Sequence, residues 1–205
     1  MIPRLLLITD RHVTPDLLPV IVQAVLGGVD HVLLREKDLN DQQLAPLATR
    51  ILQILAGTPA RLLISGRPHL ALAIGAAGVH LPQNSLSIAQ TRAILGSDKM
   101  IGRSCHDALS AKQACAQGAD YITLSPLFST PSHPQTPPLG LKKFTEICRN
   151  LDRPVLALGG INADNIHLAM TAGASGVALI RGILDQENPR AHAEKISSLM
   201  ENFID

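Results

Sequence analysis

The chain has 205 residues, a length that suits a single domain over residues 1–205. A net charge of +1 and only 2% aromatic residues argue against a nucleic-acid-binding protein, which would need a basic surface or stacking side chains. The chain is 46% hydrophobic, but the start MIPRLLLITD is too short for a signal peptide and no apolar run approaches the ~18 residues of a membrane span, so we expect a cytoplasmic protein.

Short apolar runs alternate with longer helical patterns from one end of the chain to the other. Predicted strands cover 4–9, 31–35, 61–65, 78–81, 100–104, 121–125, 154–158 and 176–180. Predicted helices cover 16–27, 40–57, 68–75, 86–95, 108–117, 139–150, 162–172 and 189–203. Alternation of this kind indicates an α/β fold with a parallel sheet, and eight units indicate a closed (β/α)8 TIM barrel. An open doubly wound sheet is the rival fold.

Four similar segments support the barrel. They read GGVDHVLL from Gly27, GAAGVHLP from Gly75, GADYITLS from Gly118 and GASGVALI from Gly173. In each, the glycine is expected to form the left-handed cap of a helix just before a strand. The copies precede every second strand, which favours a barrel with fourfold internal repetition.

Basic residues follow the strand over 31–35. Arg35 and Lys37 lie two residues apart and would share one face if the strand continues that far, with Glu36 on the opposite face. That face would bind an anionic substrate. An exposed charged turn is the alternative that the spacing leaves open.

A phosphate site is predicted after the last two strands, the usual place in this fold. Gly159-Gly160 leads directly into the helix expected from Asn162, and glycines let an anion approach backbone N–H groups. Ile180-Arg181 follows the last strand. The Arg181 side chain would either close the pocket or point outward into a salt bridge.

Three histidines fall at or near the active edge of the predicted barrel. His106 follows the strand over 100–104 and suits proton transfer, although a hydrogen-bonding spacer is an equal alternative. His80 lies inside a strand and is interpreted as a packed, structural residue. His133 lies in a proline-rich loop over 128–138, which is either a functional lid or an ordinary surface loop.

Carboxylates are missing where a metal would be held. Mg²⁺ bound with a diphosphate needs acidic ligands, but Ser65-Gly66 and Asn84-Ser85 end two neighbouring strands. No histidine or cysteine cluster predicts zinc. The sequence therefore predicts no metal site.

In order along the chain, several segments together resemble the thiamine phosphate synthase/TenI superfamily. They are ITDR (8–11), LLREKD (33–38), RP with LALAIGAAGVHLPQ (67–83), IGRSCH (101–106), GADYITLSPLFSTPSHP (118–134), LALGGIN (156–162) and GASGVALIRGI (173–183). The resemblance implies a TIM barrel, a role in thiamine biosynthesis, and a thiazole phosphate bound between the last two strands.

Within the superfamily, the resemblance to synthases differs from the resemblance to TenI proteins. Synthases join a pyrimidine diphosphate to a thiazole phosphate with Mg²⁺, and carry Asn-Asp where this chain has Ser65-Gly66. Their Gln-Glu-Asp loop is Gln83-Asn84-Ser85 here, the Gln before Leu-Arg-Glu-Lys is Leu33, and a pyrophosphate-contacting Lys is His133. TenI proteins look like synthases that have lost the metal site, and they tautomerise a carboxythiazole phosphate with a histidine at the position of His106.

The resemblance therefore favours a TenI-like thiazole tautomerase, an isomerase without a cofactor. In it His106 would be catalytic, and the backbone at Gly159, Gly160, Ile180 and Arg181 would bind the phosphate. The substrate-binding residues are expected to be Arg35, Lys37, Ser65, Thr130, Ser132 and His133. A divergent synthase, a transferase that needs Mg²⁺, is the first alternative. A non-catalytic or regulatory barrel that binds a phosphate ligand is the second. The expected partner is a small thiazole phosphate rather than nucleic acid or a membrane, and a homo-oligomer is compatible with the sequence.

Overall fold

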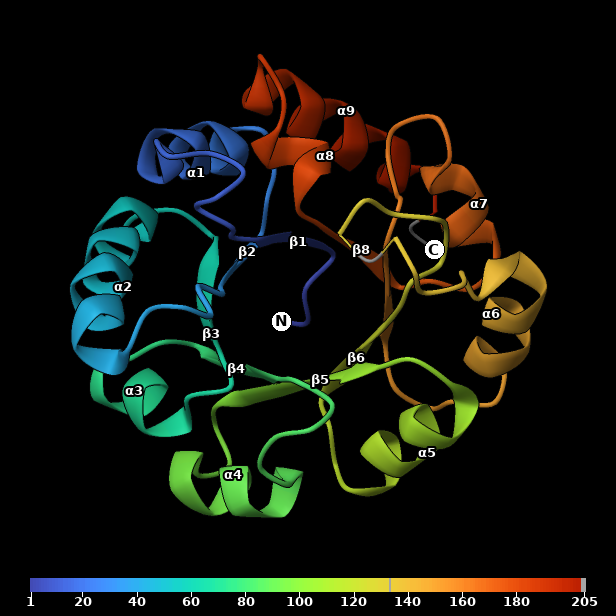
Figure 1. Ribbon diagram of the computed structural model, residues 1–205, viewed down its shortest axis with the longest axis horizontal. Coiled ribbons are helices and arrows are strands. Elements are labelled where there is room, and N and C mark those ends of the chain that lie inside the picture. Colours follow the sequence, from blue (N-terminus) through green and yellow to red (C-terminus); the bar gives the residue numbers. More distant parts are fainter. Residues whose placement is uncertain (133, 204–205) are drawn as a thin grey trace.

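A computed structural model describes residues 1–132 and 134–203 of the chain. Eight parallel strands close into a barrel in the order β1-β2-β3-β4-β5-β6-β7-β8, with helices around the outside (Figure 1). The strands are β1 Leu5–Ile8, β2 His31–Leu34, β3 Arg61–Ser65, β4 Gly78–Leu81, β5 Met100–Cys105, β6 Tyr121–Leu124, β7 Val155–Leu158 and β8 Gly176–Leu179. The predicted TIM barrel is confirmed, and each predicted strand agrees with an observed one to within a residue at either end.

The helices follow the predicted alternation with one addition. They are α1 Leu17–Leu26, α2 Asp41–Leu55, α3 Pro68–Ala73, α4 Ile88–Leu95, α5 Ala108–Ala116, α6 Gly140–Cys148, α7 Ile166–Thr171, α8 Arg181–Leu184 and α9 Pro189–Glu201. The single turn α8 was not predicted because four residues leave no periodic pattern. In the described part of the chain, no helix is long and apolar enough to span a bilayer.

The start of α7 differs from the prediction of a helix from residue 162. The Asn162 side chain accepts the backbone N–H groups of Asp164 at 2.9 Å and Asn165 at 3.2 Å. Such short side-chain bonds compete with helix formation and hold the backbone in a turn. The helix therefore begins only at Ile166, and Gly159-Gly160 does not open directly into it.

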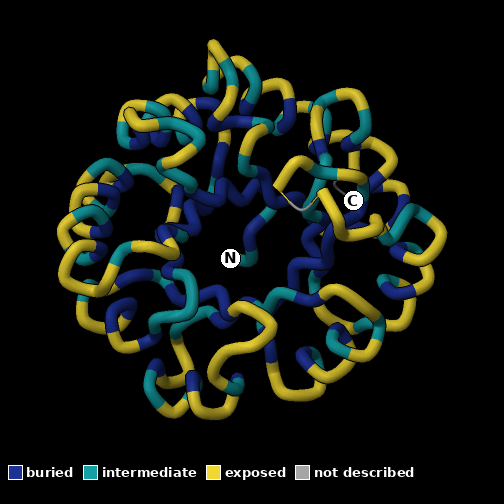
Figure 2. Tube along the Cα trace, viewed as in Figure 1, coloured by how far each residue is buried: buried dark blue, intermediate teal, exposed yellow. Residues whose placement is uncertain are grey.

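Two hydrophobic layers follow from the alternation of side chains along each strand. One set of positions fills the barrel interior, including Leu6, Leu33 and Leu156. The other set, including Val32 and Ile64, packs against the surrounding helices. Figure 2 shows the buried strands as an inner ring and exposed backbone mainly on the outer helices and loops.

The glycine caps agree with the repeat in three of its four copies. Gly75, Gly118 and Gly173 have positive φ angles, but Gly27 has a φ of −88° and the left-handed residue is Gly28 at +100°. Gly27 is a glycine for a different reason, since a Cβ there would lie 2.5 Å from the backbone oxygen of Arg190. In this copy the glycine pair permits α1 to pack closely on α9.

Candidate active site

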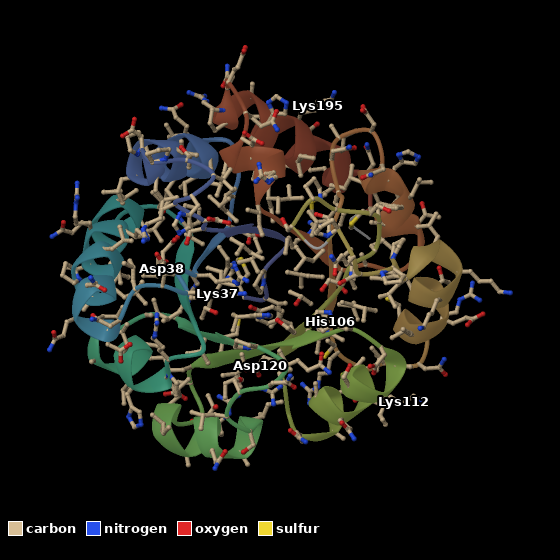
Figure 3. All side chains as sticks on the ribbon, viewed as in Figure 1. Lys37, Asp38, His106, Lys112, Asp120 and Lys195 are labelled. Atoms are coloured by element: carbon tan, nitrogen blue, oxygen red, sulfur yellow. The ribbon has the colours of Figure 1, made fainter. Side chains whose placement is uncertain are left out.

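Functional side chains collect at the carboxyl ends of the strands, the edge that forms active sites in this fold. Figure 3 shows Lys37, which follows β2, and His106, which follows β5, on different sides of the barrel opening. This edge is called the mouth below. The residues around it divide into a side-chain half, after β1 to β6, and a backbone half, after β7 and β8.

Glu36 sets the orientation of the basic pair. β2 ends at Leu34, so the two-residue strand spacing does not extend to Arg35 and Lys37. Instead the Glu36 carboxylate is 2% exposed and accepts the Thr9 hydroxyl at 2.6 Å and the Arg11 N–H at 3.1 Å. Because Glu36 is held inward, the basic neighbours on either side of it are free to face the mouth.

Arg35 and Lys37 lie close enough to repel one another. The Arg35 charge is the main cause that lowers the pKa of Lys37, followed by partial burial. Burial also lowers the pKa of Arg35, although Asp10 and Glu36 oppose this effect. In the described part of the chain neither cation forms an ion pair. Two neighbouring cations without ion-pair partners among the described residues can bind an anion.

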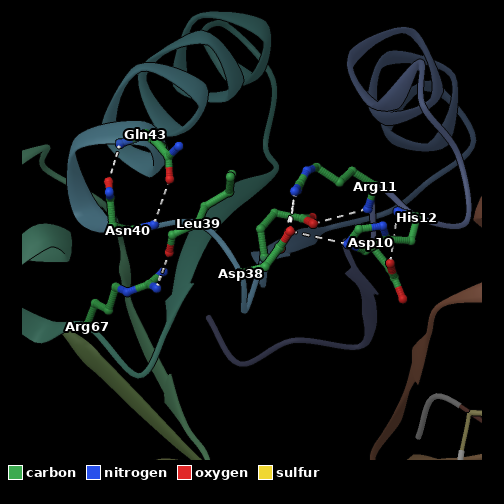
Figure 4. A network of polar contacts seen from close by, with 9 residues as sticks. Asp10, Arg11, His12, Asp38, Leu39, Asn40, Gln43 and Arg67 are labelled. Carbon is green, nitrogen blue, oxygen red and sulfur yellow. Dashed lines mark hydrogen bonds and ion pairs between the residues drawn. The ribbon is translucent and has the colours of Figure 1, made fainter.

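The acidic groups near the basic pair are already occupied by protein partners. Asp38 pairs with the Arg11 guanidinium and lies 3.4 Å from His12, as Figure 4 shows. Asp10 accepts the backbone N–H of His12 at 3.0 Å. These contacts tie the loop after β1 to the loop after β2 and leave the basic pair without a carboxylate of its own.

A second set of contacts fixes the loop after β2 to the end of β3. The Arg67 guanidinium donates to the Leu39 carbonyl at 2.5 Å and pairs with Asp41 at 2.9 Å. Figure 4 shows Arg67 reaching Leu39, beside the Asn40–Gln43 capping pair of α2. The loops of the first three strands are therefore held as one unit.

Ser65 and Gly66 end β3, where the synthase resemblance implies metal-binding residues. The facing loop after β4 carries Asn84 and Ser85, and it is held by Arg103, which donates to the Ser85 hydroxyl at 3.1 Å and to two backbone carbonyls. Hydroxyl and amide groups beside a guanidinium are a poor donor set for Mg²⁺, which is usually held by carboxylates. Among residues 1–132 and 134–203, no three His, Cys, Asp or Glu side chains cluster as metal ligands would. The residues do not fit Mg²⁺.

His106 is anchored through one ring nitrogen. Its Nδ1 lies 2.8 Å from the Ser125 carbonyl oxygen, which can only accept, so Nδ1 carries the proton. The neutral ring then has Nε2 as an unprotonated acceptor. The side chain is exposed at the mouth, and the next residue, Asp107, caps α5 by accepting the Ser110 N–H at 2.7 Å. That hydrogen bond holds the pKa of Asp107 below its ordinary value. The predicted catalytic histidine has the geometry of an acid–base group.

The backbone half begins with Gly159 and Gly160. A Cβ on Gly160 would lie 2.4 Å from the Ser129 carbonyl oxygen, and one on Gly159 would lie 2.7 Å from the Pro126 Cβ. Both glycines have positive φ angles, +100° and +66°. The glycines therefore allow the loop after β6 to pack on the end of β7, in addition to any ligand they admit.

Unpaired amides gather at the ends of β7 and β8. Among the described residues, the N–H groups of Gly160, Ile161, Arg181 and Gly182 have no hydrogen-bond acceptor. A Cβ on Gly182 would lie 3.3 Å from the Ile161 carbonyl, so the two segments adjoin. Adjacent unpaired amides bind anions, and phosphate is the anion most often found at these two strands.

Two of the predicted phosphate residues take part in different ways. The Ile180 carbonyl accepts the N–H groups of Ile183 and Leu184 and so forms the turn that presents the amides. The Arg181 guanidinium pairs with Asp185 at 2.9 Å, and both side chains are about half exposed. Of the two alternatives for Arg181, the outward salt bridge is correct, and only its backbone faces the site.

The loop after β6 contributes a hollow of its own. Thr130 accepts the Ser132 N–H at 3.4 Å. A cavity of about 510 Å³ is lined by the loop residues Ser129, Thr130, Pro131, Pro134, Gln135, Thr136, Pro137 and Pro138. The predicted substrate residue His133 lies outside the described residues. The loop adjoins Gly160 and so borders the phosphate half of the mouth.

The hydrogen bonds of His80 beneath the mouth were not predicted from the sequence. His80 lies 2.9 Å from the Ser104 hydroxyl and 3.0 Å from the Tyr121 hydroxyl. The structural interpretation of His80 is correct as to burial, but its partner Ser104 lies only partly buried at the end of β5. The sequence contained a signal for this contact. Side chains two residues apart on a strand share a face, so His80 lies on the same face of β4 as Gly78, and Ser104 on the same face of β5 as Gly102.

Comparison with known proteins places the chain in a family. The family described as thiamine monophosphate synthase matches residues 5–183, and the chain belongs to it. A relative from Geobacter sulfurreducens, whose name ascribes thiamine-phosphate synthase activity provisionally, is 44% identical over 96% of this chain and 93% of its own. The thiamine-phosphate synthase of Desulfitobacterium hafniense is 37% identical over 97% of both chains.

The structural comparison agrees with the sequence comparison. Thiamine phosphate pyrophosphorylase from Pyrococcus furiosus superposes with a TM-score of 0.90 at 27% identity, covering 98% of this chain and 97% of that chain. The protein is thus a TIM barrel that belongs to an enzyme family of thiamine biosynthesis, as the sequence predicted. The relatives carry the synthase name, so the preference for the TenI branch stays a prediction.

Proposed function

We propose that this barrel is a TenI-like thiazole tautomerase, which binds a carboxythiazole phosphate and aromatises its ring by moving a proton. The observation that carries the proposal is the His106 ring, held by its Nδ1–H on the Ser125 carbonyl with Nε2 open to the mouth. The residues after β3 and β4 support it, because Gly66, Asn84 and Ser85 stand where the resemblance implies the carboxylates of a synthase.

Substrate binding uses both halves of the mouth. The unpaired amides of Gly160, Ile161, Arg181 and Gly182 hold the phosphate. Arg35 and Lys37 hold the substrate carboxylate, whose negative charge relieves the repulsion between them. With both ends of the ligand fixed, the thiazole ring lies across the mouth within reach of the histidine.

His106 performs the proton transfer. Nε2 takes the proton that leaves the ring system, and the imidazolium then returns a proton at the position that completes the aromatic ring. The Nδ1–H bond to the Ser125 carbonyl becomes charge-assisted in the imidazolium and so stabilises it. General acid–base catalysis of this kind contributes about 10²- to 10⁴-fold.

Thiamine phosphate synthesis is the second candidate. The names of relatives at 35–44% identity favour it. This reaction releases pyrophosphate, whose developing charge needs stabilisation by a metal or by cations. Arg35 and Lys37 are the cations that this chain offers for it.

The proposal is tested by incubating the purified protein with the non-aromatic thiazole tautomer and following aromatisation. We expect turnover by the wild type and a loss of about 100-fold or more in His106→Ala. His192→Ala is the matched control, since His192 is a partly exposed histidine whose Nδ1 also lies near a carbonyl, that of Asn188 at 3.2 Å.

Three results would contradict the proposal. Equal turnover by wild type and His106→Ala would remove the catalytic assignment. Absence of tautomerisation together with Mg²⁺-dependent formation of thiamine phosphate would establish the synthase, and absence of both reactions with retained ligand binding would establish a non-catalytic barrel.

A further inference from the structure

We infer that His80 and Tyr121 form a positioning pair that fixes the Ser104 hydroxyl as a hydrogen-bond donor toward the ligand in the mouth. The three side chains form a hydrogen-bonded series from the barrel interior to the end of β5. Tyr121 contacts His80 Nδ1 at 3.0 Å, and His80 Nε2 contacts Ser104 Oγ at 2.9 Å. The role of Ser104 toward a ligand rests on the proposed binding of thiazole phosphate. The donor and acceptor roles of Tyr121, His80 and Ser104 do not.

The direction of the first bond follows from the burial of Tyr121. The phenol is fully buried and burial raises its pKa, so it keeps its proton. Its hydroxyl has one partner among the described residues, the Nδ1 of His80. A buried O–H group without an acceptor is costly, so the phenol donates and Nδ1 accepts.

In the second bond His80 must then be the donor. A neutral imidazole has one donor and one acceptor nitrogen, so acceptance at Nδ1 places the ring proton on Nε2. His80 is neutral because burial, with Arg103 and Arg35 nearby, lowers its pKa to about 3. Nε2–H therefore donates to Ser104 Oγ, with Thr123 Oγ1 at 3.3 Å as a weaker acceptor.

Ser104 is left with its own proton to donate. Its oxygen already accepts from His80, and in the described part of the chain its hydroxyl has no acceptor. The side chain is partly buried at the carboxyl end of β5, and Ser65 ends β3, two strands away in the barrel. The free O–H is thus available to an acceptor atom of the ligand between the phosphate and carboxylate contacts.

The fold makes room for this pair. Gly102 lies on β5 between His80 on β4 and Tyr121 on β6, and a Cβ there would lie 2.2 Å from the Tyr121 ring and 2.5 Å from His80 Nδ1. The two rings also pack with their centroids 5.4 Å apart. A glycine is therefore required at position 102 for the phenol to reach the imidazole.

The tautomer is tested on the wild-type protein by NMR with ¹⁵N-labelled histidine. We expect His80 to carry one proton, on Nε2, at every pH from 5 to 8. A proton on Nδ1, or a protonated ring within that range, would overturn the inference, whether or not the protein turns over a thiazole.

A double-mutant cycle tests the link to the ligand. Calorimetry with thiazole phosphate should give about fivefold weaker binding for Ser104→Ala, the effect of one hydrogen bond. Tyr121→Phe should weaken binding by a similar or smaller factor alone, and by less than twofold in the Ser104→Ala background. Inorganic phosphate should bind equally to all of these variants.

Ser97→Ala provides the matched control, since Ser97 is an exposed serine in the loop that precedes the other end of β5. Equal effects of Tyr121→Phe in both backgrounds would show that the phenol does not act through Ser104. A parallel loss of inorganic phosphate binding would indicate general damage and would also contradict the positioning role. If Tyr121→Phe does not fold, the wild-type tautomer decides.

Discussion

The two halves of the mouth offer a ligand different kinds of group. After β7 and β8 the donors are backbone amides exposed by glycine-rich turns, and the Arg181 side chain there is paired outward with Asp185. After β1 to β6 the groups are side chains: Arg35 and Lys37 flank the buried Glu36, and the Ser125 carbonyl holds His106. Backbone can hold a phosphate, but proton transfer needs titratable side chains.

From this difference we expect the two halves to respond differently to substitution. A phosphate site built from amides depends on backbone conformation, so it survives replacement of the residues across the mouth. The side-chain half changes chemistry with a few substitutions, such as Ser65 and Gly66 in place of a synthase's Asn-Asp. Four further measurements test the difference between the two halves of the mouth.

The largest effect is expected from the pH dependence of stability. The folded-state pKa of His80 is about 3, against 6.5 for the unfolded chain, so between these values only the unfolded state binds the proton. Stability should therefore be complete above pH 6.5 and fall as pH decreases, with a contribution of about 1.4 kcal/mol per pH unit from this residue. Urea unfolding from pH 4 to 8 should show a steeper slope for wild type than for His80→Gln. Equal slopes would contradict a neutral, buried His80, and His192→Gln serves as the control at a partly exposed histidine.

The next effect concerns the backbone half. Gly160→Ala places a Cβ 2.4 Å from the Ser129 oxygen at a φ of +66°, whereas Gly75→Ala has a φ of +73° and no described atom within 4 Å of its Cβ. Both pay for the left-handed backbone, so the difference between them, about 1–3 kcal/mol in the free energy of unfolding, isolates the close approach. Phosphate affinity should fall more than about tenfold in Gly160→Ala alone. Equal stability of the two variants would show that the loop does not constrain this turn.

A change in the side-chain half should leave phosphate binding nearly intact. Arg35→Met removes one charge-assisted bond and should weaken binding of the carboxythiazole phosphate by about 10- to 100-fold. The pKa of Lys37 should also rise toward its ordinary value, since Arg35 is the main cause that lowers it. NMR of the lysine side chains and calorimetry measure both, with Arg190→Met on the exposed face of α9 as the control. An unchanged Lys37 pKa would mean that the two cations do not meet.

The smallest effect is expected for Arg181→Ala. Its side chain pairs with Asp185 on the surface, so the free energy of unfolding should change by less than about 0.5 kcal/mol. Phosphate affinity should stay within about twofold, because only the backbone of this residue faces the site. A loss of more than about tenfold would show that the guanidinium turns inward to bind the ligand.

Much of the fold was predictable because the strands carry strong local signals. Runs such as LLLI and HVLL are short, apolar and regularly spaced, and they fix the barrel without any long-range information. The start of α7 was not predictable from periodicity, because the Asn162 turn depends on side-chain hydrogen bonds. The four-residue α8 is too short to leave a pattern.

The site was predictable in position but less so in mechanism. Strand ends identified His106, Arg35 and the Gly159-Gly160 turn, because parallel strands bring these ends together. The hydrogen bond between His80 and Tyr121 was not, since the two residues are 41 positions apart and meet over Gly102 of the strand between them. The outward direction of Arg181 depends on Asp185 one helical turn away, which spacing alone left open.

His106 is proposed to move a proton without a metal, and one experiment tests both parts of this proposal. The purified wild-type protein would be assayed for tautomerisation in EDTA and again in Mg²⁺, with thiamine phosphate formation followed in the same samples. The proposed mechanism predicts equal tautomerisation in both and no thiamine phosphate in either. Thiamine phosphate formed only with Mg²⁺, without tautomerisation, would contradict it.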